Sequence, residues 1–393
     1  MMVQALSDAG HSVQLAAPTL GDEELALRSS LRASIVHLPP SEDTEDAVDA
    51  MRTWQQMLEM DDAAARQVRR ILYNRDLLRT LRDRLGAAPP DFIYERASPY
   101  STTGVMLARE LGRPLLLELN APLAVEQSIY RKTGLEELAA RAEAWTVRQA
   151  SAVLAVSTAV RQHATSLGVD PARVHVVPNA VDPAHFRPGP PDPTLRARWD
   201  LGDGPVLGFV GSLRAWHGVR VLAELLARLR PRFSGLRLLV VGDGPLRHEL
   251  EQAARELGVV DSVVFTGALP HEQVGALIRC FDVGLAPYPA LEHSFYFSPL
   301  KLFEYMASGV PVVASAQGQV ADIIVPNETG LLHAPGDTLS MASAVEQLLV
   351  DPERREALGR AGARRIHAHH TWTHNALRII ELAETLMTPE RSI

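Results

Sequence analysis

The segment that decides the fold of this chain is FYFSPLKLFEYMASGVPVVAS, which runs from Phe295 to Ser315. Ser298 is suited to cap a helix, and Pro299 is suited to its first turn, where a missing N–H costs nothing. Apolar residues then recur at helical spacing until Gly309, which is expected to end the helix. The following run, 310–314, is typical of a parallel strand that is buried on both faces.

Two charged residues stand inside this apolar helix. Lys301 and Glu304 are three positions apart, so they share one face near the helix N-terminus. A helix N-terminus attracts anions, Lys301 adds a full positive charge, and Glu304 can accept hydrogen bonds from hydroxyls. The pair therefore predicts a site for a phosphate followed by a sugar diol. An ordinary surface ion pair is the alternative interpretation.

Lysine is rare in this chain. Among 39 Lys and Arg residues only Lys132 and Lys301 are lysines. A lysine that is kept in such a composition favours a role for its compact ammonium, which a planar guanidinium cannot copy.

The bulk composition predicts a two-domain protein of the cytoplasm. The 393 residues exceed one typical core, and we expect an N-terminal domain over 1–187, a Pro- and Gly-rich linker over 188–204, a second domain over 205–370 and a C-terminal helix over 371–393. A net charge of -8 argues against nucleic acid as a partner, and the single cysteine, Cys280, fits a reducing compartment. No apolar run reaches the roughly 18 residues that span a bilayer.

The N-terminal region raises two expectations. Residues 1–10 are expected to be a helix that ends at Gly10, so a doubly wound domain would need a further strand and loop upstream of the stated start. The segment from Arg66 to Arg84 carries seven arginines and two aspartates on a predicted helix. Such a helix either rests on an anionic membrane as a peripheral contact or is balanced by the acidic segment 42–62.

Polar residues at the ends of predicted strands mark candidate binding sites. From Asp91 onward strands and helices alternate, and Glu95, Arg96, Glu118 and Asn120 follow buried strands. Ligands of open parallel sheets bind at these strand ends, although each residue could instead cap a loop.

The second domain repeats this arrangement. A strand ends at Gly211, and Arg214 and His217 lie in the loop that follows, where an arginine fork suits a pyrophosphate. Arg247 stands where a dinucleotide fingerprint needs its third glycine, so we interpret the neighbouring Gly-Asp-Gly as a tight turn.

With these elements in place, the chain resembles the retaining glycosyltransferases of family 4 from about Asp91 to Glu381. The motifs that carry the resemblance are VVPNAVD, GSLRAWHG, VVGDGP, VVFTG, DVGLAPY and FEYMASGVPVVAS, in that order. The resemblance implies an α/β GT-B fold of two facing Rossmann-like domains with parallel sheets, and a C-terminal helix that packs back on the N-terminal domain.

The resemblance also implies roles for individual residues. The family has two acids eight positions apart, of which the second, binding the ribose, corresponds to Glu304, while the first is replaced by Tyr296. Its diphosphate-binding arginine corresponds to Arg214 and its lysine position to His217. The chain is closer to a branch with GSLKPWHG and SPLKLFEYMA motifs, in which Lys301 supplies the charge.

The predicted site falls into three sets of residues. Arg214, Lys301 and Glu304 are expected to be catalytic. The acceptor set is Arg96, Glu118 and Asn120, the last in place of a family histidine. Donor contacts are expected from Gly211, His217, Leu269, Tyr296, Ser298, Pro299, Leu300 and Leu302. No metal and no cofactor beyond the nucleotide sugar are expected.

These residues predict transfer of a sugar from a nucleoside diphosphate to a hydroxyl of a glycan, a lipid-linked or a small-molecule acceptor. Cations and helix dipoles would stabilise the departing diphosphate. Tyr296 removes one candidate nucleophile and so favours front-face attack, although Glu292 lies nearby in the sequence. A nucleotide-sugar epimerase of the same architecture and a catalytically inactive partner subunit are the alternatives.

Overall fold

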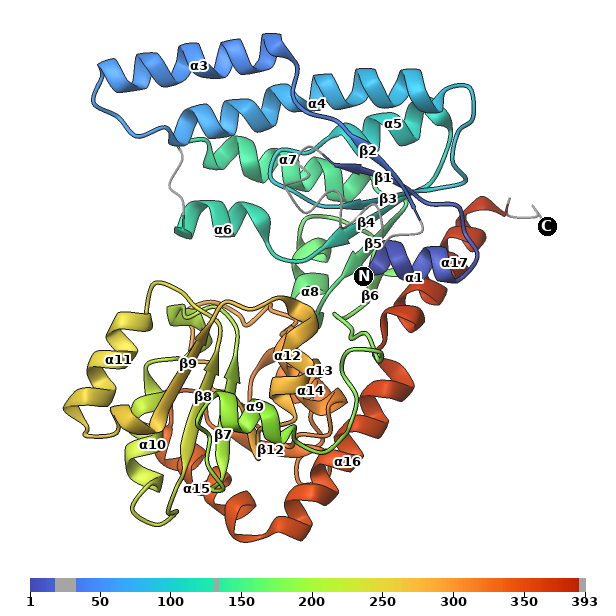
Figure 1. The fold of residues 1–393 in the computed structure, drawn as a ribbon. Coiled ribbons are helices and arrows are strands. Elements are labelled where there is room, and N and C mark those ends of the chain that lie inside the picture. The colour runs from blue at the N-terminus through green and yellow to red at the C-terminus, as the bar shows by residue number, and fades with distance from the viewer. Residues whose placement is uncertain (18–32, 131–133, 389–393) are drawn as a thin grey trace. The chain divides into compact units, whose positions relative to one another are not determined.

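The chain forms two compact units in a computed structural model that describes residues 1–17, 33–130 and 134–388 (Figure 1). The first unit comprises residues 1–178 and 373–393, and the second comprises residues 179–372. The boundary between the two units, at residues 178 and 179, therefore lies before the predicted linker over 188–204. Helix α9 (Pro193–Arg198) lies in that linker, and Arg196 donates hydrogen bonds to the carbonyls of Gly202 and Gly204, at 2.7 and 2.9 Å. Those two contacts lie within the segment, and Arg196 Nη1 also donates to the carbonyl of Cys280 at 3.5 Å, which anchors the segment in the second unit.

The second unit is built on six parallel strands in the order β12-β11-β10-β7-β8-β9. Their bounds are β7 Val206–Val210, β8 Arg237–Val241, β9 Val263–Gly267, β10 Val283–Ala286, β11 Val312–Ser315 and β12 Gly330–His333. Alternate residues of each strand enter two separate hydrophobic cores, so both faces of the sheet are covered. This is the doubly wound arrangement that the sequence predicts.

Helices α12 (His271–Ile278), α13 (Leu300–Ala307) and α14 (Gly318–Ile323) contribute to one of these cores, and α10 (Val221–Leu229), α11 (Arg247–Glu256) and α15 (Thr338–Val350) to the other. Helix α16 (Pro352–His369) lies against α13. Short 3₁₀ turns follow β7 and precede β9, at Ala215–His217 (η2) and Val260–Ser262 (η3).

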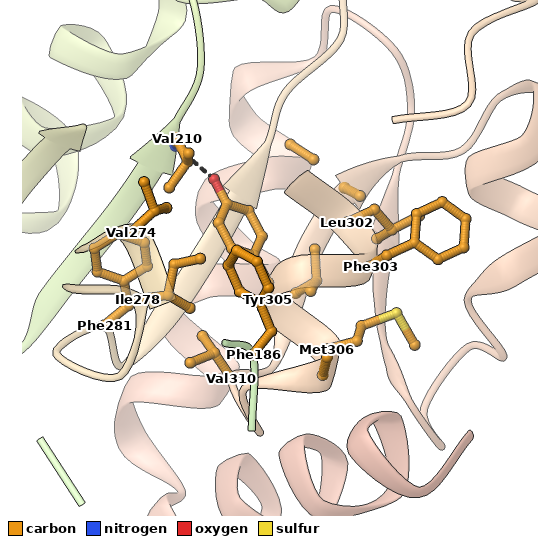
Figure 2. Packing of buried hydrophobic residues seen from close by; sticks show 14 of the residues in the cluster. Phe186, Val210, Val274, Ile278, Phe281, Leu302, Phe303, Tyr305, Met306 and Val310 are labelled. Carbon is orange, nitrogen blue, oxygen red and sulfur yellow. Dashed lines mark hydrogen bonds between the residues drawn. The ribbon is translucent and has the colours of Figure 1, made fainter. Parts of the chain in front are cut away.

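Tyr305 fixes helix α13 to the end of strand β7. Its buried oxygen accepts a hydrogen bond from the N–H of Val210 at 2.6 Å, and its ring packs within the apolar core (Figure 2). A Cβ at Gly284 of β10 would lie only 2.6 Å from this ring, so glycine is required there. Lys301, one turn earlier on α13, is thereby held near the loop that follows β7.

The first unit contains a parallel pair, β1 (Gln14–Ala17) with β2 (Ser34–His37), and a parallel sheet in the order β3-β4-β5-β6. The sheet strands are β3 Ile93–Arg96, β4 Leu115–Leu119, β5 Ala152–Ala155 and β6 Val174–Val176. The helices are α1 Met2–Asp8, α3 Glu42–Met57, α4 Ala63–Leu85, α5 Thr103–Leu111, α6 Leu123–Tyr130, α7 Glu136–Gln149 and α8 Thr158–Ser166, with the 3₁₀ turn η1 at Pro171–Arg173.

Helix α17 (Trp372–Met387) belongs almost entirely to this first unit. Asn375 Nδ2 donates to the carbonyl of Pro178 at 2.7 Å, and Arg378 Nη1 donates to that of Val176 at 2.9 Å. The prediction that the C-terminal helix packs on the N-terminal domain is confirmed.

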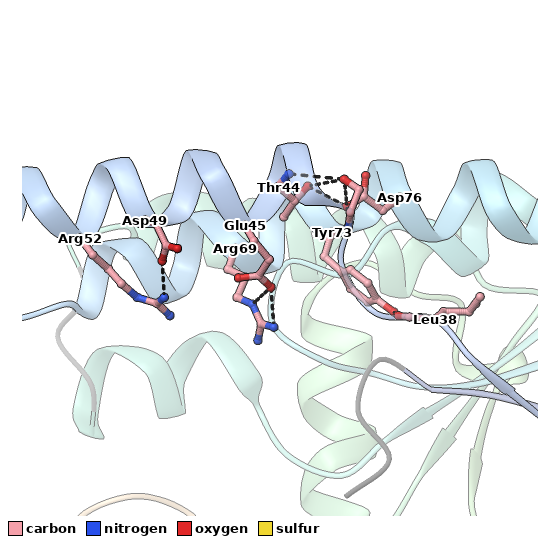
Figure 3. A network of polar contacts seen from close by, with 9 residues as sticks. Leu38, Thr44, Glu45, Asp49, Arg52, Arg69, Tyr73 and Asp76 are labelled. Atoms are coloured by element: carbon pink, nitrogen blue, oxygen red, sulfur yellow. Dashed lines mark hydrogen bonds and ion pairs between the residues drawn. The ribbon is translucent and has the colours of Figure 1, made fainter.

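The arginine-rich helix α4 pairs with acidic α3 (Figure 3). Arg69 forms an ion pair with Glu45 at 2.7 Å. Asp76 accepts hydrogen bonds from the N–H of Ser41 at 2.9 Å and from the hydroxyl of Thr44 at 2.7 Å. These contacts support the interpretation of mutually balanced helices, whereas membrane contact stays a prediction. In the part of the chain that the structure describes, no helix is both long and apolar enough to cross a bilayer.

Candidate active site

Two glycines shape the loop that follows strand β7. Gly211 has a φ of +132°, and a Cβ there would lie 3.1 Å from Lys301 Nζ. Gly218 has a φ of +69°, and a Cβ there would lie 1.6 Å from the carbonyl oxygen of Pro287. Any side chain at Gly218 would therefore displace the loop after β7 from the loop after β10. The backbone at the carboxyl ends of these neighbouring strands is therefore closely packed, and the Lys301 ammonium lies against it at Gly211.

Lys301 is a buried lysine whose ammonium lacks a hydrogen-bond acceptor among the described residues. Its side chain is 7% exposed, and no acceptor among the described residues lies within reach of Nζ. The ammonium lies 4.1 Å from the ring centroid of Phe209 and 5.5 Å from that of Tyr288. Burial lowers the pKa of Lys301 to about 7, while Glu304 opposes that shift. Because an unpaired buried charge is costly, this position favours an anion.

Glu304 is also buried, at 5% exposure, and it is paired with a histidine. Its Oε1 accepts a hydrogen bond from Nε2 of His271 at 2.9 Å. That hydrogen bond raises the pKa of His271. Among the described residues no ion pair joins Lys301 to Glu304, so the interpretation of a surface pair is wrong. The two groups lie side by side in the protein interior and have different partners.

Sequence analysis did not identify His271, although a signal for it was present. His271 begins the helix that follows β9, so it lies at the same edge of the sheet as the other strand-end residues. Leu269, two residues earlier, is partly buried and packs against the core.

His217 and Arg214 lie in the same loop but have different electrostatic properties. His217 Nδ1 lies 2.7 Å from the carbonyl oxygen of Ser212 and donates to it. Burial lowers the pKa of His217 to about 4, and the nearby charges of Lys301 and Arg214 add to this shift. A neutral His217 cannot replace the charge of the lysine for which it stands in the family comparison. Arg214 is exposed, with its guanidinium 5.1 Å from the ring centroid of Trp216.

The start of helix α13 differs from the prediction in two respects. Ser298 does not cap the helix, because its hydroxyl accepts the N–H of Asn179 at 2.9 Å; Pro299 is the N-cap residue. The N–H of Leu302 is bonded to the carbonyl of Pro299 at 3.0 Å, and its side chain is buried in the core. Leu302 therefore cannot donate to a ligand, which leaves the first two helical amides, those of Leu300 and Lys301.

Tyr296 occupies an aromatic cluster before α13. It is 3% exposed, its ring is 4.5 Å from that of Phe297, and it stacks on His293 at 5.4 Å. Glu292 is exposed. The buried position that carries an acid in the family comparison is thus occupied by a phenol.

The predicted acceptor residues come together in the first unit. Asn120 Nδ2 donates to Glu118 Oε1 at 2.7 Å, and Arg96 Nε lies 3.7 Å from the same oxygen. Tyr94, which was not predicted, donates its hydroxyl to the other oxygen of Glu118. Glu95 points elsewhere, accepts a hydrogen bond from Ser101 and has a pKa that is raised by burial. Glu95 is therefore better explained as a structural residue.

The described ranges contain no group of three His, Cys, Asp or Glu residues that could hold a metal ion.

Two family models match the chain. The model for glycosyl transferases group 1 covers residues 204–351, and the model for the glycosyl transferase 4-like domain covers residues 1–180. The chain therefore belongs to the group 1 glycosyltransferases of family 4, which are hexosyltransferases of GT-B fold.

Individual relatives agree with this assignment. The chain is 32% identical over 265 residues to the 2-deoxystreptamine glucosyltransferase of Streptomyces kanamyceticus, covering 66% of this chain and 67% of that protein. It is 30% identical to a GDP-mannose-dependent phosphatidylinositol monomannoside mannosyltransferase of Mycolicibacterium smegmatis, covering 67% of this chain and 74% of that one. The fold is similar to that of Anabaena HepE solved with UDP and glucose, with a TM-score of 0.72, 18% identity and coverage of 98% and 94%.

Proposed function

We propose that this glycosyltransferase moves a hexosyl group from a nucleoside-diphosphate sugar to an acceptor hydroxyl, with retention of configuration and without a metal ion. The relatives' names support a nucleoside-diphosphate sugar as the donor, since one of them is GDP-mannose-dependent. A similar fold is known in complex with UDP-glucose.

The environment of Lys301 is the observation that carries the proposal. Its buried ammonium has no acceptor within the described part of the chain and lies against Gly211, whose lack of a side chain lets a ligand approach. A diphosphate would supply the missing negative charge, and exposed Arg214 could close on it from the same loop. Glu304 lies one helical turn further on, which suits the ribose that follows the diphosphate in such a donor.

The position of these charges supports the following reaction. The bond between the sugar C1 and the β-phosphate oxygen breaks, and Lys301 and Arg214 stabilise the negative charge that gathers on the diphosphate. The acceptor oxygen bonds to C1 on the same face, and its proton passes to the departing phosphate oxygen. Tyr296 cannot act as a carboxylate nucleophile, so we propose this front-face route over a covalent intermediate.

The acceptor set Arg96, Glu118 and Asn120 provides both donors and acceptors of hydrogen bonds, which suits a polyhydroxylated molecule. We propose that it binds a glycan, a lipid-linked or a small-molecule acceptor. A lipid-linked acceptor would bring the enzyme into peripheral contact with a membrane.

The test begins with thermal shift against UDP-, GDP-, ADP- and TDP-sugars, followed by assays of nucleotide release with and without candidate acceptors. We expect one donor class to stabilise the protein and to turn over only with an acceptor, with undiminished rates in EDTA. Glu304→Gln should weaken nucleotide binding about tenfold, the scale of hydrogen bonds to a charged group. Conversion of the donor sugar without an acceptor would favour an epimerase, and loss of turnover in EDTA would contradict metal independence.

A further inference from the structure

His271 connects two helices through a hydrogen bond. It begins α12, and its Nε2 donates to Glu304 Oε1 on α13 at 2.9 Å, although the residues are 33 positions apart. Its ring lies 5.1 Å from that of Phe186. The imidazole is therefore packed on one side and bonded at one nitrogen, while 47% of its side chain stays exposed. This arrangement lets the imidazole fix the Glu304 carboxylate without closing the site.

A buried carboxylate needs such a partner. Glu304 is 5% exposed, and Lys301, the nearest cation on its own helix, forms no ion pair with it among the described residues. Of the side chains that the structure describes, His271 is the one that donates a hydrogen bond to Glu304. Oε1 is thereby engaged, while Oε2 keeps its capacity to accept hydrogen bonds.

We propose that His271 is a positioning residue for donor binding, which holds the Glu304 carboxylate in the orientation that presents Oε2 to the ribose hydroxyls. The inference rests on the proposed function, because it needs Glu304 to contact the ribose. His271 acts through Glu304 and not through contact with the reacting atoms.

The groups around His271 favour its protonated form. Glu304 faces it from α13, Glu272 is on its own helix, and Asp182, which is paired with His185 at 2.9 Å, lies in the segment before α9. Phe186, from the same segment, carries no charge, and Lys301 on α13 is turned toward Phe209. The hydrogen bond to Glu304 raises the pKa of His271 most, partial burial opposes this rise, and the charges of Glu304, Glu272 and Asp182 add to it. While His271 is protonated, the contact is an ion pair, and as pH rises through the raised pKa it becomes a weaker hydrogen bond from a neutral imidazole to the Glu304 carboxylate.

The experiment compares His271→Ala and His271→Gln with His248→Gln, a substitution at an exposed histidine of α11. UDP and GDP are first tested for binding, and the tighter of the two is used as the probe. Its Kd is measured by calorimetry from pH 5.5 to 9. We expect His271→Ala to weaken binding about five- to tenfold, the scale of one hydrogen bond to a charged group, and His271→Gln to recover most of this loss because an amide can donate to Glu304.

Two further measurements separate positioning from a general loss of structure. With the 2′,3′-dideoxy form of the same nucleotide, the His271→Ala effect should shrink to within about twofold, because no ribose hydroxyl remains for Glu304 to bind. The double variant of His271→Ala and Glu304→Gln should bind the nucleotide no more weakly than Glu304→Gln alone. The Kd of the wild type should rise with pH as both His271 and Lys301 lose their protons. In His271→Gln the part of this rise that comes from His271 should be absent, and the part that comes from Lys301 should remain.

An unchanged Kd in His271→Ala, or a loss of equal size for the ribo- and dideoxynucleotides, would overturn the inference. Failure of the proposed function is distinguishable, because Glu304→Gln itself would then leave nucleotide binding unaltered. If Glu304→Gln weakens binding and His271→Ala does not, the proposed ribose contact stands and only the positioning role is lost.

Discussion

Lys301 shows how strongly one residue depends on its surroundings. On a surface helix its charge would be permanent at neutral pH, but burial against Phe209 and Tyr288 brings its pKa to about 7. The protonation of this ammonium therefore responds to any anion that binds beside it.

The first prediction compares two substitutions of this residue. Lys301→Ala should lower turnover about a hundredfold, the scale of one lost preorganised donor. Lys301→Arg should also be impaired, because the larger guanidinium does not fit the space between Phe209, Tyr288 and Gly211. Steady-state kinetics at saturating donor provide the measurement. Turnover of Lys301→Arg close to wild type would end the claim that Lys301 stabilises the leaving group.

The second prediction follows from the same pKa. At pH 8 Lys301 is mostly neutral in the free enzyme, and a bound diphosphate raises its pKa. Nucleotide binding at this pH should therefore be accompanied by uptake of at most about one proton by the protein. At pH 6 the residue is already protonated and uptake should vanish, so affinity should fall as pH rises above 7. Calorimetry of UDP or GDP binding in buffers of different ionisation enthalpy measures this uptake. Lys301→Met is the control, and equal uptake in that variant would assign the proton to another group.

At the scale of elements, the loops after neighbouring strands hold the site together. The loop that follows β7 touches the backbone after β10 at Gly218 and the backbone after β8 at Gly242, where a Cβ would lie 2.2 Å from the carbonyl oxygen of Gly211. The Gly-Asp-Gly turn after β8 therefore serves close packing between loops.

The third prediction uses two glycines with nearly the same φ. Gly218 has a φ of +69°, and a Cβ there would lie 1.6 Å from the carbonyl oxygen of Pro287. Gly258 has a φ of +68°, and a Cβ there would have no neighbouring atom within 4 Å. Gly258→Ala should cost about 1 kcal/mol, which corresponds to a fall in Tm of roughly 2–4 °C. Gly218→Ala should cost clearly more and should weaken nucleotide binding, because the loop must move. Thermal unfolding measures the stability of both variants, and nucleotide titration measures their affinity. Equal effects of the two variants on stability and affinity would show that the contact with Pro287 is unimportant.

At the scale of the whole molecule, the two ends of the chain belong to one unit. Helix α17 supplies buried residues to the first unit although the second unit separates it from the rest of that unit in sequence. The N-terminal unit therefore cannot complete its fold until the C-terminal helix is present.

The fourth prediction tests this with two apolar residues of α17. Ile379 is fully buried and Leu377 is 54% exposed. Ile379→Ala should destabilise the protein by about 2–5 kcal/mol, while Leu377→Ala should change stability by less than about 0.5 kcal/mol. Denaturant unfolding measures both, and nucleotide binding at low temperature should be retained in each. Equal stability of the two variants would contradict the packing of α17.

Much of the architecture was predictable from local patterns. Alternation of buried strands and amphipathic helices follows from short-range periodicity, so the parallel sheets, the helix over α13 and its end at Gly309 were all predicted. The proximity of Lys301 and Glu304 was also predictable, because three positions along a helix place two side chains on one face whatever surrounds them.

The sequence alone therefore determined the order of the helices and strands and the kinds of side chain that lie at the ends of the strands. Only the tertiary structure decided which of these groups are buried and which partners they have. His271 donates a hydrogen bond to Glu304 across 33 positions, and the backbone N–H of Asn179 donates to the hydroxyl oxygen of Ser298 across 119. Such contacts depend on how helices and loops pack in three dimensions, and burial in turn sets the pKa values of Lys301 and His217. No local pattern carries that information, because desolvation depends on atoms contributed by distant parts of the chain.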